Sequence, residues 1–573
     1  MKVPSIITLQ EHAVCGAKAI RGAVLLFSCC LNMYAMETNT ADVIVVGATP
    51  SGVSAAIAAA RSGAQVILVE ESTHVGGIVS GGLTNTDINK HASVGGLFNE
   101  FKRRIREHYT KTYGENSEQM KLCRDGNMFE PSIAEKVFRE MLAGEKGIRV
   151  LEGQRVVAAN VIDSRGMERQ AEPGKRLDGA TPKDFGGHSK LVSISAEATS
   201  KVKERTQLRA KAFIDATYEG DLAAIAGVPY RVGRESRTTF KEPHAGNIYI
   251  RFKDYNPLPG STGEADGGIQ AFCFRLHLTK DKANSVPIEK PTGYNRDDYK
   301  VLLDEIAAGK ITRLGQVIQF FPMPNGIFEV NSSHPNADTG IPGQSLDLAE
   351  ENWTWPEAGF EERARIFQRY WTYNEGMLWL LQHDEGVTEA LRTEALQWGF
   401  PTAEFKDHRH RPHHIYVRQG RRIWGESNFT ERSADFEFST GLPKRQSTGI
   451  AIAEYAFDSH AVHKYNPAWP GLREGYLYVP HDPVQIPFGV VVPHCVDGLL
   501  VPVACSATHI GYQSIRMEPV FMALGEACGI AATAAQKTQV EVRAVDVRDV
   551  QREIINRGGV VLYESQVMRP DGL

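Results

Sequence analysis

A short apolar run begins the first regular element of the chain. Residues 41–46 carry almost no polar side chain, a pattern typical of a strand that is buried on both faces of a parallel sheet. A glycine-bounded turn at 47–52 follows, and residues 53–62 read as an alanine-rich helix. A second apolar strand pattern covers 65–69. Together these segments predict a strand–helix–strand unit of about 30 residues.

Later apolar runs predict a return to the same sheet. Residues 212–216 and 498–505 have the pattern of buried strands, and 147–211 alternates short β-like runs with polar turns, as in a β-meander. Residues 506–518 are expected to form a loop. Residues 519–536 are expected to form a helix that begins with proline and keeps small residues inside for close packing.

The region between these sheet segments predicts an insertion. It is rich in aromatic residues and histidine, and 361–382 and 389–398 have the spacing of amphipathic helices. We therefore expect an α/β fold: a Rossmann-like dinucleotide-binding domain with a βαβ unit and a β-meander, carrying an inserted α+β substrate domain. The expected boundaries are a leader at 1–35, the dinucleotide-binding domain at 36–235 and 440–540, the insertion or cap at 236–439, and a C-terminal tail at 541–573.

Composition narrows the classes of function. The chain has 573 residues, 42% of them hydrophobic and 23% charged, which excludes a disordered or coiled-coil protein. The formal net charge of -5 provides no basic field for nucleic acid or an anionic membrane. After the leader, no stretch approaches the ~20 apolar residues of a transmembrane helix.

The cysteines indicate neither a metal ribbon nor a disulfide framework. There are 8 cysteines and no Cys-x-x-Cys. Three of them fall within the first 30 residues, so a processed chain would keep five, which we expect to be free and largely buried thiols.

The amino terminus has the order of a secretory signal. Lys18 and Arg21 precede the apolar run 23–31, and small residues end at Ala35. This predicts a periplasmic or secreted protein. The alternatives are initiation at Met36, which would give a cytoplasmic protein, and a weak lipoprotein site at 26–29.

The first turn carries the chemistry of a dinucleotide site. Gly47 makes the tight turn, Gly52 allows close packing of helix on strand, and the helix N-terminus offers N–H groups to a pyrophosphate. Glu70, 23 residues after Gly47, suits the ribose hydroxyls and disfavours NADP. Thr49 replaces the usual middle glycine and Pro50 removes one donor. A glycine-rich turn without a ligand is the alternative.

A second glycine loop identifies the cofactor class. Residues 71–82 (ESTHVGGIVSGG) resemble the loop after the second strand of glutathione-reductase-type flavoproteins, and Ala216-Thr217 to Asp221 resembles their Ala-Thr-x-x-Gly-Asp element. With the first turn, these motifs are similar to the FAD-dependent oxidoreductase family, distantly related to fumarate reductase flavoproteins. The resemblance implies FAD. The residues it implies for FAD binding are Gly47, Ala48, Pro50, Ser51, Gly52, Glu70, Glu71, Gly76, Gly77, Gly82, Val156, Ala216, Thr217, Asp221, Ser506, Gly511 and Ser514.

The same resemblance places 506–518 against the flavin, where candidate catalytic residues lie. His509 is the candidate base, because histidine titrates near neutrality; alternatively it only makes structural hydrogen bonds. Arg516 and Arg418 are candidates to anchor a substrate carboxylate or an anionic flavin, with Tyr512 as an orienting donor. The histidine-rich run 408–418 lacks accompanying cysteines or patterned carboxylates, so we expect no metal.

These features predict an FAD-dependent oxidoreductase, a dehydrogenase or oxidase that moves hydride between a small polar substrate and flavin N5. The aromatic insertion and the export signal favour a sugar or polyol carbinol. The alternatives are a reductase of the fumarate-reductase type and a non-catalytic flavin-binding electron-transfer partner. The expected partners are a small-molecule substrate and an undefined electron acceptor, without nucleic acid. The sequence leaves the oligomeric state open.

Overall fold

A computed structural model describes most of the chain after the predicted leader. The described residues are 39–89, 91–177, 188–200, 203–251, 253–336, 340–341, 343–435 and 443–563. The predicted leader and Met36 lie outside them. Of the helices in these ranges, none is both long and apolar enough to cross a membrane.

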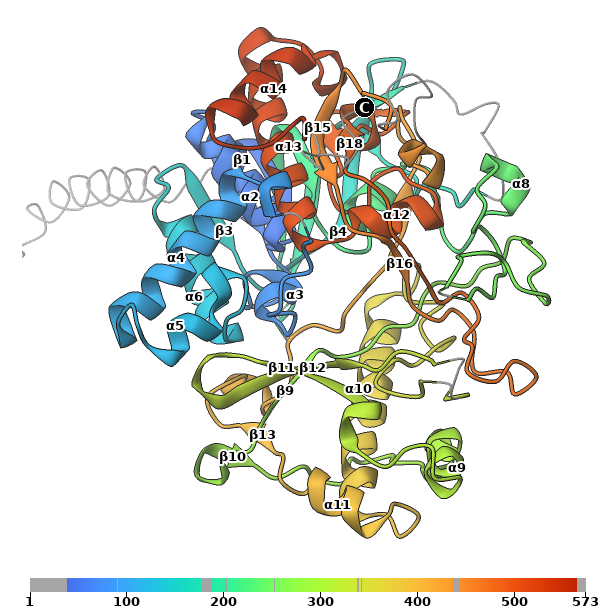
Figure 1. Ribbon diagram of the computed structural model, residues 1–573. Coiled ribbons are helices and arrows are strands. Elements are labelled where there is room, and N and C mark those ends of the chain that lie inside the picture. Colours follow the sequence, from blue (N-terminus) through green and yellow to red (C-terminus); the bar gives the residue numbers. More distant parts are fainter. Residues whose placement is uncertain are drawn as a thin grey trace, which may run out of the picture. The chain divides into compact units, whose positions relative to one another are not determined.

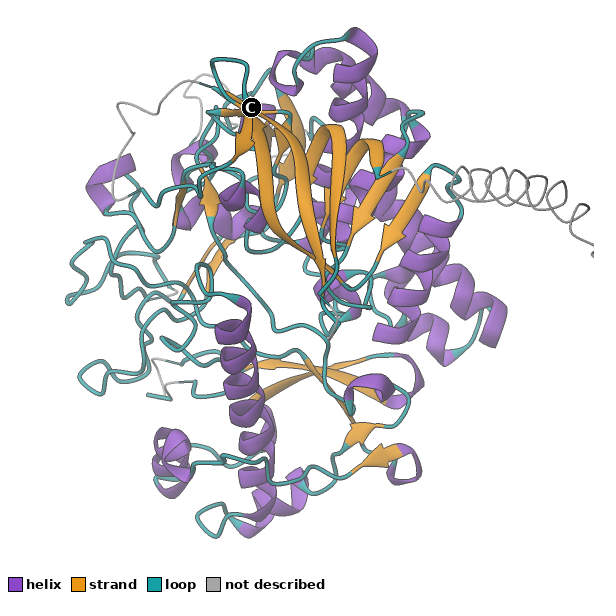
Figure 2. Ribbon diagram, turned by 180° about the vertical axis from the view of Figure 1, so that it is seen from behind, coloured by secondary structure: helices purple, strands orange, loops and turns teal. Residues whose placement is uncertain are grey.

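Among the described residues, nine strands form one central sheet in the order β3-β2-β1-β7-β6-β4-β5, with β19 beside β6 and β20 beside β7. The pairs β1/β2, β2/β3, β6/β19 and β7/β20 are parallel, whereas β4/β5, β4/β6 and β6/β7 are antiparallel. The predicted Rossmann-like sheet and its meander are therefore continuous, and the α/β prediction is confirmed (Figure 2). The strands are β1 (Thr40–Val46), β2 (Val66–Val69), β3 (Ile148–Leu151), β4 (Gln154–Ile162), β5 (Glu168–Gln170), β6 (Ser189–Ala198), β7 (Arg205–Asp215), β19 (Val496–Asp497) and β20 (Leu499–Leu500).

Two strand predictions differ from the structure. The sequence analysis assigned β3 to the meander, but β3 pairs with β2 and extends the parallel half of the sheet. The prediction was wrong because the pattern of a four-residue strand does not reveal its partner. The predicted strand 498–505 is reduced to β20. The backbone then leaves the sheet: Val501 N donates to Val491 O at 2.8 Å and Ser506 N donates to Val490 O at 2.8 Å.

Helices α2 (Pro50–Arg61) and α13 (Glu518–Thr538) pack closely against each other. A Cβ on Gly525 would lie 2.1 Å from Ser51 O, so only glycine permits this approach. α2 begins three residues before the predicted helix because Thr49 caps it, accepting from Gly52 N at 3.2 Å, and proline suits its first position.

Further helices surround this pair (Figure 1). The predicted tail contains α14 (Val547–Asn556), which buries Val550 and Ile554 and packs on α13, so the fold continues past 540. The other helices outside the insertion are α3 (Gly77–Ser80), α4 (Gly96–Tyr113), α5 (Glu118–Leu122), α6 (Pro131–Ala143), α7 (Asp221–Ile225) and α12 (His509–Ile515).

The insertion has its own small sheet, β11-β12-β9, and a long helix, α10 (Phe360–His383), which lie together in Figure 1. The amphipathic spacing predicted for 361–382 gives α10 a buried stripe, formed by Ile366, Tyr370, Tyr373, Met377, Leu380 and Leu381. The other elements of the insertion and the strands that follow it are α8 (Arg237–Phe240), β9 (Leu276–Thr279), β10 (Ser285–Val286), α9 (Lys300–Ala307), β11 (Ile318–Pro322), β12 (Ile327–Ser332), α11 (Glu389–Ala395), β13 (Phe400–Pro401), β14 (Arg422–Ile423), β15 (Gly449–Ala453), β16 (Phe457–Ser459), β17 (Leu477–Val479) and β18 (Val484–Pro487).

The insertion returns to the sheet domain before its predicted end. β14 pairs with β8 (Tyr230–Arg231), and Ile423 N donates to Ala504 O at 2.9 Å. The cysteines in the described residues are free and, apart from the half-buried Cys495, buried, as predicted: Cys123, Cys273, Cys495, Cys505 and Cys528.

Candidate functional site

A cavity of about 420 Å³ opens where β1, β2 and β7 end and β4 begins. Ligands of open α/β sheets bind beyond the carboxyl ends of the strands, so this is the expected position for a nucleotide. Six predicted cofactor residues line it: Gly47, Glu70, Glu71, Val156, Thr217 and Asp221. The insertion contributes Trp355, Phe360, Arg363, Ala364, Phe367, Gln368, His413, His414, Ile415 and Val417.

The first glycine turn is fixed from two sides. Gly47 has φ +94°, and a Cβ on Gly52 would lie 1.8 Å from Gly47 O, so the turn needs glycine at both positions. Ala216 N donates to Val46 O at 2.8 Å, and Thr49 Oγ1 donates to Ala216 O at 2.8 Å. The turn and the predicted Ala-Thr element therefore meet at the cavity.

Glu70 braces the same turn. Its Oε2 accepts from Ala48 N at 2.7 Å, and its Oε1 accepts from Ser72 N at 2.9 Å and Ser72 Oγ at 2.8 Å. Burial raises the pKa of Glu70, against these hydrogen bonds. Glu70, which the sequence predicts to bind the ribose hydroxyls, thus holds the turn that shapes the cavity.

The second glycine loop is tied to α13. Gly76 and Gly77 have φ +104° and +50°, and Ile78 N donates to Tyr218 Oη at 3.0 Å. Tyr218, which lines the cavity, donates to Glu518 Oε1 at 2.9 Å. The loop and the first turn of α13 therefore lie close together.

These residues fit an FAD dinucleotide. Within the described residues, four buried polar atoms around the cavity and the N-terminus of α2 have no partner: Ser51 Oγ, Gln154 Oε1, Arg155 Nε and His414 Nε2. A buried polar atom without a partner is costly, and a ligand with phosphates and hydroxyls would supply one. Gly47, Glu70 and the N-terminus of α2 would hold such a ligand.

Glu518 gives a prediction for stability. Burial raises its pKa to about 8 from 4.5, against the hydrogen bond from Tyr218. Between pH 4.5 and about pH 8, Glu518 of the folded apoprotein therefore keeps a proton that the unfolded chain has lost. Its free energy of unfolding should fall as pH rises through that window, by up to about 1.4 kcal/mol per pH unit for this group. Denaturant titrations across the window should show a shallower dependence for Glu518→Gln; an unchanged slope would contradict the assignment.

Three predicted cofactor residues lie elsewhere, around α12. Ser506 Oγ donates to Asn428 Oδ1 at 3.3 Å, and Ser514 Oγ donates to Tyr455 O at 2.7 Å. A Cβ on Gly511 would lie 2.4 Å from Phe429 O. The predicted loop 506–518 is thus largely a helix, which these residues attach to neighbouring segments.

Arg516 and Arg418, two candidate catalytic residues, meet at Tyr416. Arg516 donates to Tyr416 Oη at 2.9 Å and pairs with Asp458 at 3.0 Å. Arg418 lies 4.7 Å from the Tyr416 ring centroid and pairs with Asp347 at 3.0 Å. Although burial works to raise it, the Arg418 charge helps to hold the pKa of Asp347 well below its usual value. Both arginines are therefore buried in ion pairs.

His509 begins α12 and is buried. Its Nε2 lies 3.4 Å from Ser459 Oγ, its backbone N donates to Glu235 Oε2 at 2.7 Å, and its Nδ1 has no partner within the described residues. Burial and the charge of Arg422 hold its pKa well below 6.5, so the imidazole is neutral at pH 7. By contrast, Tyr512 donates to Val503 O at 3.1 Å, a bond that stabilises the fold.

Sequence reasoning missed Asp87. It is half-buried and follows the second glycine loop by five residues, counted from Gly82. Burial raises its pKa, and the charges of Arg275, Arg516 and Arg418 oppose this effect. The position of this carboxylate, five residues after a predicted flavin loop, is the sequence feature that could have identified Asp87 as a candidate site residue.

The histidine-rich run joins the insertion to the second glycine loop. The ring of His413 stacks between those of His74 and His408, at centroid distances of 4.2 and 5.0 Å, and His74 pairs with Glu135 at 3.1 Å. Burial and the charge of His74 lower the pKa of His413 to about 4. Among the described residues, no cluster of three or more metal-ligating side chains could hold an ion.

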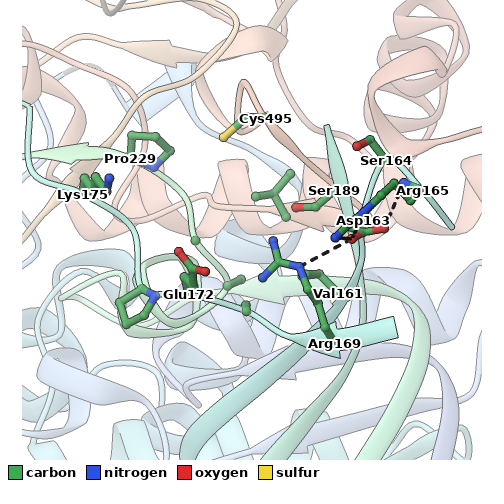
Figure 3. A pocket seen from close by; sticks show the side chains of 15 residues that line it. Val161, Asp163, Ser164, Arg165, Arg169, Glu172, Lys175, Ser189, Pro229 and Cys495 are labelled. Carbon is green, nitrogen blue, oxygen red and sulfur yellow. Dashed lines mark hydrogen bonds and ion pairs between the residues drawn. The ribbon is translucent and has the colours of Figure 1, made fainter. Parts of the chain in front are cut away.

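A second cavity, of about 550 Å³, lies beside the meander and shares no residue with the first (Figure 3). Its charges largely pair with one another: Asp163 lies 2.9 Å from Arg165 and 3.8 Å from Arg169. The side chain of Arg165 is 72% exposed, so this part of the wall is open to solvent. The other polar residues in its wall are Ser164, Glu172, Lys175, Ser189 and Cys495.

Known proteins differ in how much of the chain they match. None of the curated proteins matches the chain. Among solved structures it is similar to THI4 of Thermovibrio ammonificans (20% identity, 37% of this chain and 67% of that chain, TM-score 0.19). It is also similar to the glycerol-3-phosphate dehydrogenase of Bacillus halodurans complexed with FAD (15% identity, 39% and 45%, TM-score 0.21).

Similarities this weak carry no information on activity, and the second one spans less than half of that enzyme. The family profile described as FAD dependent oxidoreductase, however, matches residues 42–554, nearly the whole described chain. The chain belongs to the FAD dependent oxidoreductase family, and its cofactor is FAD.

Proposed function

We propose that this oxidoreductase is a dehydrogenase or oxidase that takes hydride from a small polar substrate, with a sugar or polyol carbinol as the favoured class. The observation that carries the proposal is the segment 413–418. His413, His414, Ile415 and Val417 line the dinucleotide cavity, whereas Tyr416 and Arg418 belong to the buried network with Arg516.

In this proposal the reaction centre lies next to the cavity. FAD, when bound, supplies an acceptor for hydride at its N5. The chain supplies paired arginines, the Tyr416 hydroxyl and two groups for proton transfer, the neutral His509 and the half-buried Asp87. Burial raises the pKa of Tyr416 to about 12, so its hydroxyl keeps its proton and donates hydrogen bonds.

An anaerobic screen tests the proposal. The purified flavoprotein is mixed with sugars, polyols, amines and 2-hydroxy acids, and the visible flavin absorbance is followed. We expect a sugar or polyol to bleach the flavin. If no compound bleaches it, whereas a chemically reduced sample is reoxidised by an unsaturated dicarboxylate, the enzyme is a reductase and the proposal is wrong.

We also propose, from the leader pattern alone, that the protein is periplasmic or secreted. The mass of the native amino terminus tests this directly. A native chain that begins at Met36 would instead indicate a cytoplasmic protein.

A further inference from the structure

We propose that the insertion is the second wall of the FAD site, and that the ion pair of Arg363 with Asp221 latches α10 over the bound dinucleotide. The sequence assigned this region to the substrate. The inference rests on FAD as the cofactor and is independent of the substrate class.

One face of α10 forms the wall. Phe360, Arg363, Ala364, Phe367 and Gln368 line the cavity, and their spacing of three and four residues places them on one side of the helix. The stripe that begins at Ile366 is instead buried in the insertion core. α10 therefore separates the cavity from that core.

The latch joins α10 to the start of α7. Arg363 Nη2 donates to Asp221 Oδ1 at 2.9 Å and Nη1 donates to Asp221 Oδ2 at 2.5 Å, a bidentate pair. Arg363 Nε also donates to Trp355 O at 3.0 Å, and Arg421 pairs with Asp221 at 2.8 Å. Arg363 is only 9% exposed, so loss of its guanidinium would leave a gap in a buried network.

A second contact crosses between the two domains at the meander. The Arg155 guanidinium lies 3.6 Å from the Phe360 ring centroid, within the range of a cation–π interaction. Phe360 begins α10, and Arg155 belongs to β4. The first turn of the helix is thus held from β4 and from α7, on the FAD-binding domain.

Polar atoms without partners occur on both sides of the cavity. Gln154 Oε1 and Arg155 Nε come from the meander, and His414 Nε2 comes from the insertion. A Cβ on Gly81 would lie 2.8 Å from His414 Cδ2, so this imidazole packs directly on the second glycine loop. A dinucleotide bound between the domains can satisfy both sides, whereas one bound to the FAD-binding domain alone would leave His414 unpaired.

The test is the rate at which FAD leaves the protein. Arg363→Met keeps the length and apolar contacts of the side chain but removes the latch, and it should raise the FAD dissociation rate at least about tenfold. Arg365→Met is the matched control, because Arg365 lies on the same helix, its side chain is 73% exposed, and within the described part of the chain its ion pair is with Glu362. Equal dissociation rates for the two folded variants would overturn the latch.

Hydrogen exchange of the unaltered protein tests the wall without any substitution. FAD should slow exchange in residues 360–368 and 413–417 as well as in 46–72. Slower exchange confined to 46–72 and 154–156 would overturn the inference and leave FAD as the cofactor. A single cooperative unfolding transition of the Arg363→Met apoprotein above the temperature of the release assay would show that the faster release is not a folding defect.

Discussion

Replacing Gly52 with alanine is expected to remove bound FAD from the purified protein. The added Cβ would lie 1.8 Å from Gly47 O and 3.1 Å from the Ala216 Cβ. The first contact is with backbone, so no side-chain rotation relieves it, and the turn that lines the cavity must move. Overpacking of this kind costs about 1–3 kcal/mol, or about one to two powers of ten in affinity when it falls on a binding turn.

The FAD content per chain and the dissociation constant of the apoprotein for FAD measure this effect. Gly315→Ala is the control, because a Cβ there meets nothing within 4 Å and its backbone is not left-handed. A Gly52→Ala apoprotein whose dissociation constant for FAD equals that of the unaltered protein would show that the turn does not bind the cofactor.

The parts of the fold that were predicted correctly are those specified locally. β1, α2 and β2 follow from an apolar run, a proline-initiated helix and a second apolar run within about 30 residues, and α13 follows from its small residues. The hydrogen bond from Ala48 to Glu70 and the closest contact of Gly52, with Gly47 O, also lie within this unit, whereas a Cβ on Gly47 would meet the distant Ala216.

The missed features depend on contacts between distant segments. β3 was assigned to the meander because its partner β2 lies some 80 residues earlier in the chain. α12 is short, and its cap, Thr508, accepts from Gly511 N and also donates to the distant Glu242, a partner that the sequence does not reveal. The role of α10 is the clearest case: the pattern predicted its buried stripe but not that its other face, including Phe360 and Arg363, would line the dinucleotide cavity.

The predicted site residues divide in the same way. Glu70, Val156, Thr217 and Asp221 line one cavity. The candidates on α12 lie instead among buried partners that the sequence could not pair, such as Asp458 for Arg516.

His509→Asn is expected to abolish flavin reduction by substrate while leaving bound FAD unchanged. His509 does not line the dinucleotide cavity, and its Nδ1 is buried without a partner within the described residues. As a neutral imidazole it can accept the proton of a substrate hydroxyl, a role worth about 10²–10⁴-fold in rate, and asparagine cannot accept that proton. Anaerobic stopped-flow reduction, with the FAD content measured in parallel, tests this.

Asp87→Asn separates the two candidate bases. If His509 is the base, the Asp87→Asn variant should keep most of the reduction rate and also the pH dependence of the unaltered enzyme. Because burial and Arg422 hold the pKa of His509 well below 6.5, rates in the unaltered enzyme should stay flat from pH 7 down to that lower pKa and then fall as the imidazole is protonated. Unchanged reduction in His509→Asn together with its loss in Asp87→Asn would assign the proton to Asp87, whose raised pKa would then set the lower limit of the active pH range.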